Sequence, residues 1–305
     1  MFPRLRLSSS RLTPLLRVKR FLYDKKWDTY ELSLLGDHVL QVQLNRPEKH
    51  NAMGMAFWNE TKEVFKSIQA DPVVRAVVLS GRGETFSSGR SVTPLFPFSG
   101  MDLDEFPRVM AEVAHRDSSR CGLKLRRFIE EMQEVFSSLE SCAKPIITAI
   151  QGGCIGAGVS MVAAADVRYC SQDAWFQVKE LEFGIAADVG TIQRLPHLVG
   201  SESLARELIF TGRRFNAAEA LTCGFISRVL GTHGEVVEAA VETAQRIAQL
   251  SPVAVQTSKR SLIYSRDHGV MEGLRHIVSS HIINFRSRLL MWTSSVLRDV
   301  SFCTL

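Results

Sequence analysis

The sequence predicts an α/β protein in which parallel strands alternate with helices, followed by a helical C-terminal region. First, the order strand, helix, strand occurs twice before residue 171, which implies parallel pairing with right-handed crossovers. Second, the pattern beyond Ser201 is helical almost throughout. With 305 residues, 45% apolar and 23% charged, the chain has the composition of a soluble globular protein of one large domain or two modest ones.

The first elements are marked by their apolar periodicity. Apolar residues alternate over 38–44, which predicts a strand. A turn at Arg46-Pro47 follows, and a helical pattern then covers 55–68. The run 76–81 is apolar on both faces and predicts a second, buried strand.

Prolines interrupt the middle of the chain. Pro94, Pro97 and Pro107 oppose regular structure, so we expect an irregular or partly helical excursion at the surface over residues 90–122. An amphipathic helix at 123–139 then leads back to the core.

A glycine-rich turn follows a buried strand at 145–150 and opens a helix at 159–165. Such a turn leaves backbone N–H groups unpaired and aided by the helix dipole, so it can hold an oxyanion. Neither common phosphate motif fits, because Ile155 and Met161 stand where glycines are needed and no Gly-Lys-Ser/Thr follows. The turn therefore favours stabilisation of an enolate. The alternative is a turn that only permits close helix–strand packing.

The last predicted strand covers 167–170. The helical patterns after it cover 201–210, 216–222, 235–249, 252–264 and 270–290. Helical regions of this kind, attached to an α/β core, often make subunit contacts.

Basic residues are concentrated at the N-terminus. The net charge is +5, but residues 1–26 hold eight Lys/Arg against Asp24 alone, which leaves 29 basic and 31 acidic residues elsewhere. The body therefore offers no electrostatic reason for nucleic-acid binding. The first twenty residues lack acids and include Ser8-Ser9-Ser10, which is typical of a mitochondrial presequence; the alternative is a disordered basic tail.

Other compositional signals exclude several classes. No apolar run is long enough to span a membrane. The six cysteines form no C-x-x-C pair and have no partnered histidines at metal-ligand spacing, so we expect reduced thiols and no metal. The chain ends in Cys303-Thr304-Leu305, which shares only its last residue with the Ser-Lys-Leu peroxisomal signal. We expect the mitochondrial matrix, with the peroxisome as the alternative.

Five segments resemble the crotonase (enoyl-CoA hydratase/isomerase) superfamily in order and spacing, and the resemblance runs from about Tyr30 to Arg288. Two of them, 45–53 (NRPEKHNAM) and the turn 86–89, are general to the superfamily, as is the order of strand, glycine turn and helix described above. The stretches 151–156, 176–190 and 264–268 are similar to its dienoyl-CoA isomerases. Three collinear blocks with matching gaps are more specific than a single glycine turn.

This resemblance implies a spiral core of ββα turns that binds an acyl-CoA thioester and needs no separate cofactor, since coenzyme A is part of the substrate. It also implies trimers, often paired into hexamers, through the C-terminal helices. The corresponding division of the chain is a presequence at 1–26, a core at 27–200 and a helical oligomerisation region at 201–305.

The resemblance assigns the oxyanion hole to the main-chain N–H groups of Arg90 and Ala157. Arginine is unusual at the first position, and Ser91-Val92 stands where the family usually has Asp-Leu or Asp-Ile. Substrate or coenzyme A binding is assigned to Arg46, Lys49, Ser88, Gly89, Gly153 and Gly156.

Isomerising a 3,5-dienoyl thioester requires proton removal at C2 and proton return at C6. A carboxylate acts within about 3 Å of the proton it moves, so two acids are expected. Glu180 and Asp188 match the residues that supply them in the dienoyl-CoA isomerases. We expect the apolar stretch 181–187 between them to exclude water and raise both pKa values.

Each acid has a plain structural alternative. Glu180 could be a solvated loop residue or pair with Lys179 or Arg194, and Asp188 could cap a helix that begins at Val189. Glu182 competes with Glu180, because strand alternation would turn both side chains the same way.

Ser160 departs from the family. Hydratases have a glutamate there and dienoyl-CoA isomerases an aspartate, so its absence argues against efficient hydration. Ser160 could keep a hydrogen bond to Glu180 but not the effect of a charge on its pKa.

Two other functions remain open. A 3-enoyl to 2-enoyl-CoA isomerase needs only the carboxylate of Glu180, although Asp188 and the dienoyl-like blocks oppose it. A catalytically weak homologue retained for RNA binding or assembly is favoured by Ser160, Arg90 and Ser91, but the body lacks a basic stripe.

Overall fold

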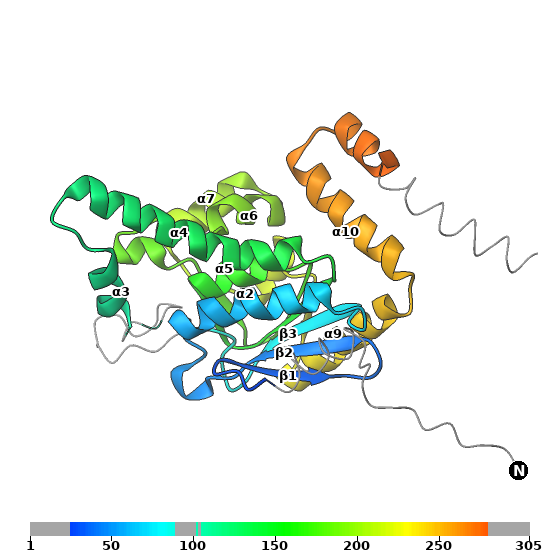
Figure 1. Ribbon diagram of the computed structural model, residues 1–305. Coiled ribbons are helices and arrows are strands. Elements are labelled where there is room, and N and C mark those ends of the chain that lie inside the picture. The colour runs from blue at the N-terminus through cyan, green and yellow to red at the C-terminus, as the bar shows by residue number, and fades with distance from the viewer. Residues whose placement is uncertain (1–24, 89–101, 103–104, 280–305) are drawn as a thin grey trace, which may run out of the picture.

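The computed structural model describes residues 25–88, 102 and 105–279. Its main sheet has six strands in the order β1-β2-β3-β4-β6-β9, and all neighbours are parallel except β1 and β2 (Figure 1). The strands are β1 (Tyr30–Leu34), β2 (Val39–Leu44), β3 (Ala76–Gly81), β4 (Ile146–Ile150), β6 (Val167–Ser171) and β9 (Arg228–Leu230). The predicted parallel α/β core is confirmed.

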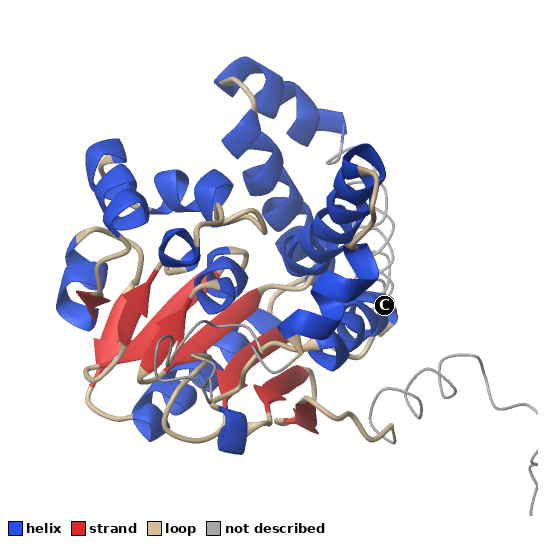
Figure 2. Ribbon diagram, turned by 90° about the vertical axis from the view of Figure 1, so that its left-hand side faces the viewer, coloured by secondary structure: helices blue, strands red, loops and turns tan. Residues whose placement is uncertain are grey.

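Helices cover both faces of this sheet (Figure 2). Along β3, Val77 and Leu79 join the larger core, which includes residues of α2 (Met55–Ala70), α4 (Ser118–Ser141) and α5 (Ala157–Ala163). The alternate residues Ala76 and Val78 join a second core against α9 (His233–Ala248). Because both faces are buried, the central strands β3 and β4 consist mostly of apolar residues, with Ser80 and Thr148 as buried polar exceptions.

A smaller sheet lies beside the glycine-rich turn and consists of β5 (Gly153–Ile155), β7 (Trp175–Gln177) and β8 (Phe215–Asn216). Phe176, Phe215 and Phe225 pack beneath it with ring centroids 5.2–5.7 Å apart. The elements that surround it are the 3-10 helix η2 (Glu180–Phe183), α6 (Thr191–Leu198), α7 (Glu202–Thr211) and α8 (Ala217–Thr222). This sheet therefore holds the glycine turn and the segment after β7 in fixed relation.

The predicted and observed elements differ mainly at short segments and boundaries. The helix expected at 123–139 begins at Ser118, because the Asp117 side chain accepts a hydrogen bond from the Arg120 N–H at 2.8 Å and caps it. The segment expected to be irregular or partly helical contains α3 (Phe106–Val113). A 3-10 helix, η1 (Pro47–Lys49), lies before α2. The smaller sheet was not expected, since strands of two or three residues have no readable periodicity.

The C-terminal helices confirm the predicted pattern as far as they are described. The helix α10 (Pro252–Asp267) and helical residues 270–279 extend from the body (Figure 1). Exposed apolar side chains lie along them, at Leu262, Val270, Met271, Leu274 and Val278. Their role in assembly stays a prediction. Within the described ranges, the chain forms no helix that is both long and apolar enough to cross a membrane.

Candidate active site

The turn at 86–88 runs alongside the glycine-rich segment. The Phe86 N–H donates to the Gln151 carbonyl at 2.8 Å, and the Ser87 N–H donates to the Gly153 carbonyl at 3.2 Å. In return, the Ile155 N–H donates to the Ser87 carbonyl at 2.9 Å. The main chain that leads to residues 89 and 90 is therefore fixed beside the chain that leads to Ala157.

Glycines make this close approach possible. At Gly152, where φ is +52°, a Cβ would lie 2.2 Å from the Glu84 carbonyl oxygen. At Gly158, it would lie 3.0 Å from the Ser87 carbonyl oxygen. A Cβ at Gly152 would overlap the facing backbone, and one at Gly158 would push it away, so both glycines favour the close contact between the two backbones.

Asn51 holds the turn from the other side. Its Nδ2 lies 3.0 Å from each of the carbonyl oxygens of Arg82, Thr85 and Phe86, and its Oδ1 accepts from the Arg46 N–H at 2.9 Å. The Ser88 N–H donates to the carbonyl of His50. Through Asn51, the motif at 45–53 thus holds the main chain of the turn that leads to Ser88. The motif alone gives no signal for this role of Asn51.

Ala157 opens the helix after the turn. Gly156 precedes it with φ of +54° and donates its N–H to the Gln177 carbonyl at 2.9 Å. In the described part of the chain, no oxygen accepts a hydrogen bond from the Ala157 N–H. This amide is therefore available to a ligand oxygen. Gly89 and Arg90, which were assigned to the same site, lie outside the described residues.

Glu180 begins η2 with its carboxyl group buried. Among the described residues, neither carboxyl oxygen has a hydrogen-bond partner. Burial raises the pKa of Glu180 to about 7. The backbone amides of Glu180 itself and Lys179 act in the opposite direction and lower this pKa, whereas the charge of Asp188 raises it further. Lys179 pairs with Glu182, and Arg194 pairs with Glu140. The alternative of a solvated or salt-bridged Glu180 is therefore wrong.

Asp188 lies close to Glu180 but in a different environment. It is half-buried, burial raises its pKa, and it lines a cavity of about 500 Å³. Its carbonyl accepts a hydrogen bond from Gln133 Nε2 of α4 at 2.7 Å. The residue preceding α6 is Gly190, and no side chain caps that helix. The alternative that Asp188 is a helix cap is wrong. No sequence signal pointed to Gln133.

Glu182 points away from Glu180. The segment 180–183, in which strand alternation was expected, forms a 3-10 helix. Each residue of such a helix turns by about 120°, so the side chains at 180 and 182 face different directions. The Glu182 carboxylate accepts from Gln177 and Lys179. The expectation that the stretch 181–187 excludes water is also wrong for most of it, since Leu181 and Ile185 are exposed and only Ala187 is buried.

Ser160 is fully buried, and its hydroxyl lies 2.5 Å from the Thr191 hydroxyl of α6. The possible hydrogen bond from Ser160 to Glu180 is not formed, because the Glu180 oxygens have no partner among the described residues. A neutral pair of hydroxyl groups therefore lies where the resemblance implied an acid. Thr191 was not anticipated from the sequence.

Arg46 and Lys49 both pair with the buried carboxylate of Asp102. The distances to its Oδ2 are 3.0 Å from the Arg46 guanidinium and 3.2 Å from Lys49 Nζ. Burial alone would raise the pKa of Asp102, but the hydrogen bonds and charges of these two cations lower it. Arg46 also donates to the Ala52 carbonyl. Their assignment to coenzyme A binding stays a prediction, and they have a structural role besides.

The described residues contain no cluster of three or more His, Cys, Asp or Glu side chains that could hold a metal ion. They offer a main-chain N–H at Ala157 without an acceptor among the described residues, a buried carboxyl group at Glu180, and a carboxyl group at Asp188 whose charge acts on Glu180. This arrangement can hold an oxyanion and move protons.

A family model described as Enoyl-CoA hydratase/isomerase matches residues 35–97 and 111–275. The chain therefore belongs to the enoyl-CoA hydratase/isomerase family, which confirms both the crotonase resemblance and the prediction of an enzyme. A solved structure titled as a putative enoyl-CoA hydratase from Streptomyces coelicolor A3(2) superposes with a TM-score of 0.75 at 25% identity, over 96% of this chain and 95% of that one. An enoyl-CoA hydratase from Bacillus anthracis gives 0.73 at 26% identity, over 88% and 96%.

Within the family, the chain is similar to curated relatives that are named as dienoyl-CoA isomerases. The chain is 45% identical to the mitochondrial Delta(3,5)-Delta(2,4)-dienoyl-CoA isomerase of Mus musculus, over 90% of this chain and 80% of the relative. The human protein of the same name is 45% identical, over 84% and 75%. A peroxisomal protein of this name from Arabidopsis thaliana is 37% identical, over 79% and 83%. The relatives thus carry both of the compartments expected from the sequence.

Proposed function

We propose that this protein converts 3,5-dienoyl-CoA to 2,4-dienoyl-CoA in fatty-acid β-oxidation. The observation that carries the proposal is the pair of neighbouring carboxyl groups, Glu180 and Asp188, whose pKa values are both raised by burial. A shift of two conjugated double bonds needs proton transfer at two distant carbons, so a pair of acids fits this reaction better than a single base. The names of the 45%-identical relatives support the same substrate.

In the proposed mechanism, the Glu180 carboxylate removes a proton from C2. The electron pair of that C–H bond moves through the diene and the thioester, which places negative charge on the thioester oxygen. In the reactive state of the pair, one proton is shared between the two carboxyl groups and lies on Asp188, which gives it to C6, and the double bonds become C2=C3 and C4=C5. Glu180 then carries the proton and Asp188 the charge, and proton exchange restores the starting state.

The main-chain N–H groups of Ala157 and Arg90 are proposed to hold the thioester oxygen. For Ala157, the support is an N–H with no acceptor among the described residues, at the start of a helix. For Arg90, the support is the fixed course of the chain up to Ser88 beside β5. A fixed donor is worth more than a mobile one, because no reorganisation is needed as charge develops.

We also propose that the substrate binds as a coenzyme A thioester without a separate cofactor. The residues proposed to contact it are Ser88, Gly89, Gly153 and Gly156, and Arg46 and Lys49 are proposed to lie near its phosphates or adenine.

The assembly proposed is a trimer or hexamer through helices after Ser201, supported by exposed apolar residues there. Light scattering should give a mass of three or six chains, and a monodisperse monomer with full turnover would contradict this assembly.

The proposed compartment is the mitochondrial matrix, reached through a presequence within residues 1–26. The basic, acid-free start of the chain and the mammalian relatives' names support it. A fluorescent reporter fused to residues 1–30 should enter mitochondria. A peroxisomal or cytosolic signal would contradict it.

The activity is tested with the purified protein and a synthetic 3,5-dienoyl-CoA, by following formation of the conjugated 2,4-dienoyl thioester. The same preparation is offered a 3-enoyl-CoA and a 2-enoyl-CoA. We expect dienoyl isomerisation to be the fastest reaction, with little hydration of the 2-enoyl substrate. If only the 3-enoyl substrate is converted, the protein is a single-base isomerase. If none is converted, the proposal of an active enzyme fails.

A further inference from the structure

Arg194 lies directly against the segment that carries Asp188. At Gly190, where φ is +121°, a Cβ would lie 1.9 Å from Nη1 of Arg194. The guanidinium thus occupies the space beside the Gly190 main chain, two residues after Asp188. The Gly190 carbonyl also accepts the Arg194 N–H at 3.0 Å, which begins α6. The positive φ favours glycine at this position, and the absence of a Cβ lets the guanidinium lie directly against the main chain.

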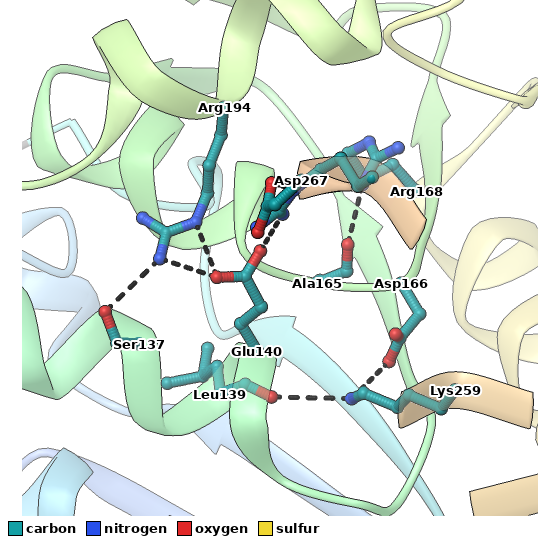
Figure 3. Close-up of polar contacts among 10 residues, drawn as sticks. Ser137, Leu139, Glu140, Ala165, Asp166, Arg168, Arg194, Lys259 and Asp267 are labelled. Atoms are coloured by element: carbon teal, nitrogen blue, oxygen red, sulfur yellow. Dashed lines mark hydrogen bonds and ion pairs between the residues drawn. The ribbon is translucent and has the colours of Figure 1, made fainter. Parts of the chain in front are cut away.

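A buried carboxylate on α4 orients Arg194. Glu140 Oε2 accepts from Nη2 of Arg194 at 2.9 Å and from Nε at 3.3 Å, and Ser137 Oγ lies 3.3 Å from the same Nη2 (Figure 3). The side chains of Arg194 and Glu140 are only 10% and 17% exposed. Two donors on one oxygen of a nearly buried carboxylate leave the guanidinium little freedom to rotate.

The other oxygen of Glu140 is used by the C-terminal helix. Arg266 of α10 donates through Nη1 to Glu140 Oε1, and it also pairs with its neighbour Asp267 at 2.7 Å. Burial alone would raise the pKa of Glu140, but the hydrogen bonds and charges of the two arginines lower it. Glu140 therefore stays ionised, and losing either arginine would leave its charge less compensated in a buried place.

These side chains face the same space as Asp188. The cavity of about 500 Å³ is lined by Asp188, Gly190 and Arg194, and also by Glu140 and Arg266. On the far side, Gln133 Nε2 holds the Asp188 carbonyl at 2.7 Å. A continuous chain of contacts thus starts at Arg266 of α10, passes through Glu140 of α4 to Arg194 of α6, and ends at Gly190. Asp188 lies two residues before Gly190.

We propose that Arg266, Glu140 and Arg194 are positioning residues for Asp188, so that this carboxyl group is correctly placed only when α10 is docked on α4. The catalytic part of this inference rests on the proposed function, whereas the positioning part does not. The network acts on Asp188 and leaves Glu180 alone, because the contacts of the three residues reach Gly190, two residues after Asp188, and none of those in the described part of the chain reaches η2. It also gives a role to the segment 264–268, which contains Arg266.

The test compares Arg266→Met and Glu140→Gln with the control Asp267→Asn in the full-length protein. Arg266→Met breaks the link to α10 yet leaves Glu140 paired with Arg194. Asp267→Asn removes a charge from the same place but leaves the link intact, since Asp267 is half exposed and its ion pair within the described ranges is with Arg266, not with Glu140. Hydrogen exchange of peptides covering 188–198 is measured by mass spectrometry, together with turnover of 3,5-dienoyl-CoA and 3-enoyl-CoA.

We expect Arg266→Met and Glu140→Gln to speed exchange at 188–198 by about tenfold or more, while Asp267→Asn does not change it. Dienoyl turnover should fall by about tenfold or more in kcat with little change in KM, because a misplaced acid fails in the transition state. Turnover of the 3-enoyl substrate, which needs Glu180, should be kept.

Unchanged exchange at 188–198 in both variants would overturn the inference. Equal losses with the two substrates would do so as well, because they would indicate general destabilisation. If the wild type lacks dienoyl activity, the proposed function fails, yet the exchange measurement still decides whether the network holds this segment.

Discussion

Glu180 and Asp188 are the same functional group in two different environments. The Glu180 oxygens are buried without a partner among the described residues, and burial raises its pKa to about 7. Asp188 is half-buried, borders a cavity and sits on a segment held by α4 and α6. Residue type therefore does not separate their roles. The surroundings give Glu180 the pKa that the proposed base needs near neutral pH, and they leave the position of Asp188 dependent on how its backbone is held.

The largest expected effect comes from removing the base. Glu180→Gln should lower kcat by at least about a hundredfold with both dienoyl and 3-enoyl substrates, because an amide cannot accept the C2 proton. Turnover of each substrate by the purified variant is the measurement.

Glu182→Gln is the matched control on the same 3-10 helix. Its carboxylate bonds Gln177 and Lys179 and points away from Glu180, so turnover should stay within about threefold of the wild type. A loss at Glu182 as large as that at Glu180 would break the assignment of the base.

The buried carboxyl group should also make stability depend on pH. The folded-state pKa of Glu180 is about 7 and its ordinary value is 4.5, so the folded state binds this proton more tightly than the unfolded state. Its contribution is therefore most favourable below pH 4.5 and is lost as pH rises to 7.

Glu180→Gln has no such group. Relative to this variant, the wild type should lose about 3 kcal/mol of unfolding free energy between pH 4.5 and pH 8. Urea unfolding of both proteins across this range measures the difference. Parallel stability curves would show that Glu180 is not desolvated as described.

A smaller effect is expected at the hydroxyl pair of Ser160 and Thr191. Ser160→Ala leaves a buried Thr191 hydroxyl without its partner and should cost about 1–2 kcal/mol of unfolding free energy. The double variant Ser160→Ala, Thr191→Val should cost less than the sum of the two single changes, because both polar groups are removed together.

The pH profile of turnover should not change in Ser160→Ala, since the hydroxyl bonds Thr191 and not Glu180. A shifted profile would mean that position 160 tunes the base despite its neutral partner.

The sequence predicted the parts of this site that depend on local backbone. The glycine turn and the strand before it follow from local sequence patterns, whereas the carboxyl groups at 180 and 188 were assigned through the resemblance to the dienoyl-CoA isomerases. The direction of Glu182 did not follow, because a 3-10 helix and a strand are indistinguishable over four residues. The Thr191 partner of Ser160 and the Glu140 partner of Arg194 lie 31 and 54 residues away, and one sequence offers no signal for such pairs.

The central claim is that two carboxyl groups share the reaction, and Asp188→Asn tests it most directly. The measurement is the ratio of dienoyl to 3-enoyl turnover in the variant, divided by the same ratio in the wild type. An asparagine cannot give a proton to C6, so this ratio should fall by about a hundredfold, while the 3-enoyl reaction continues on Glu180 alone. An unchanged ratio would contradict the two-acid account and leave Glu180 as a single base.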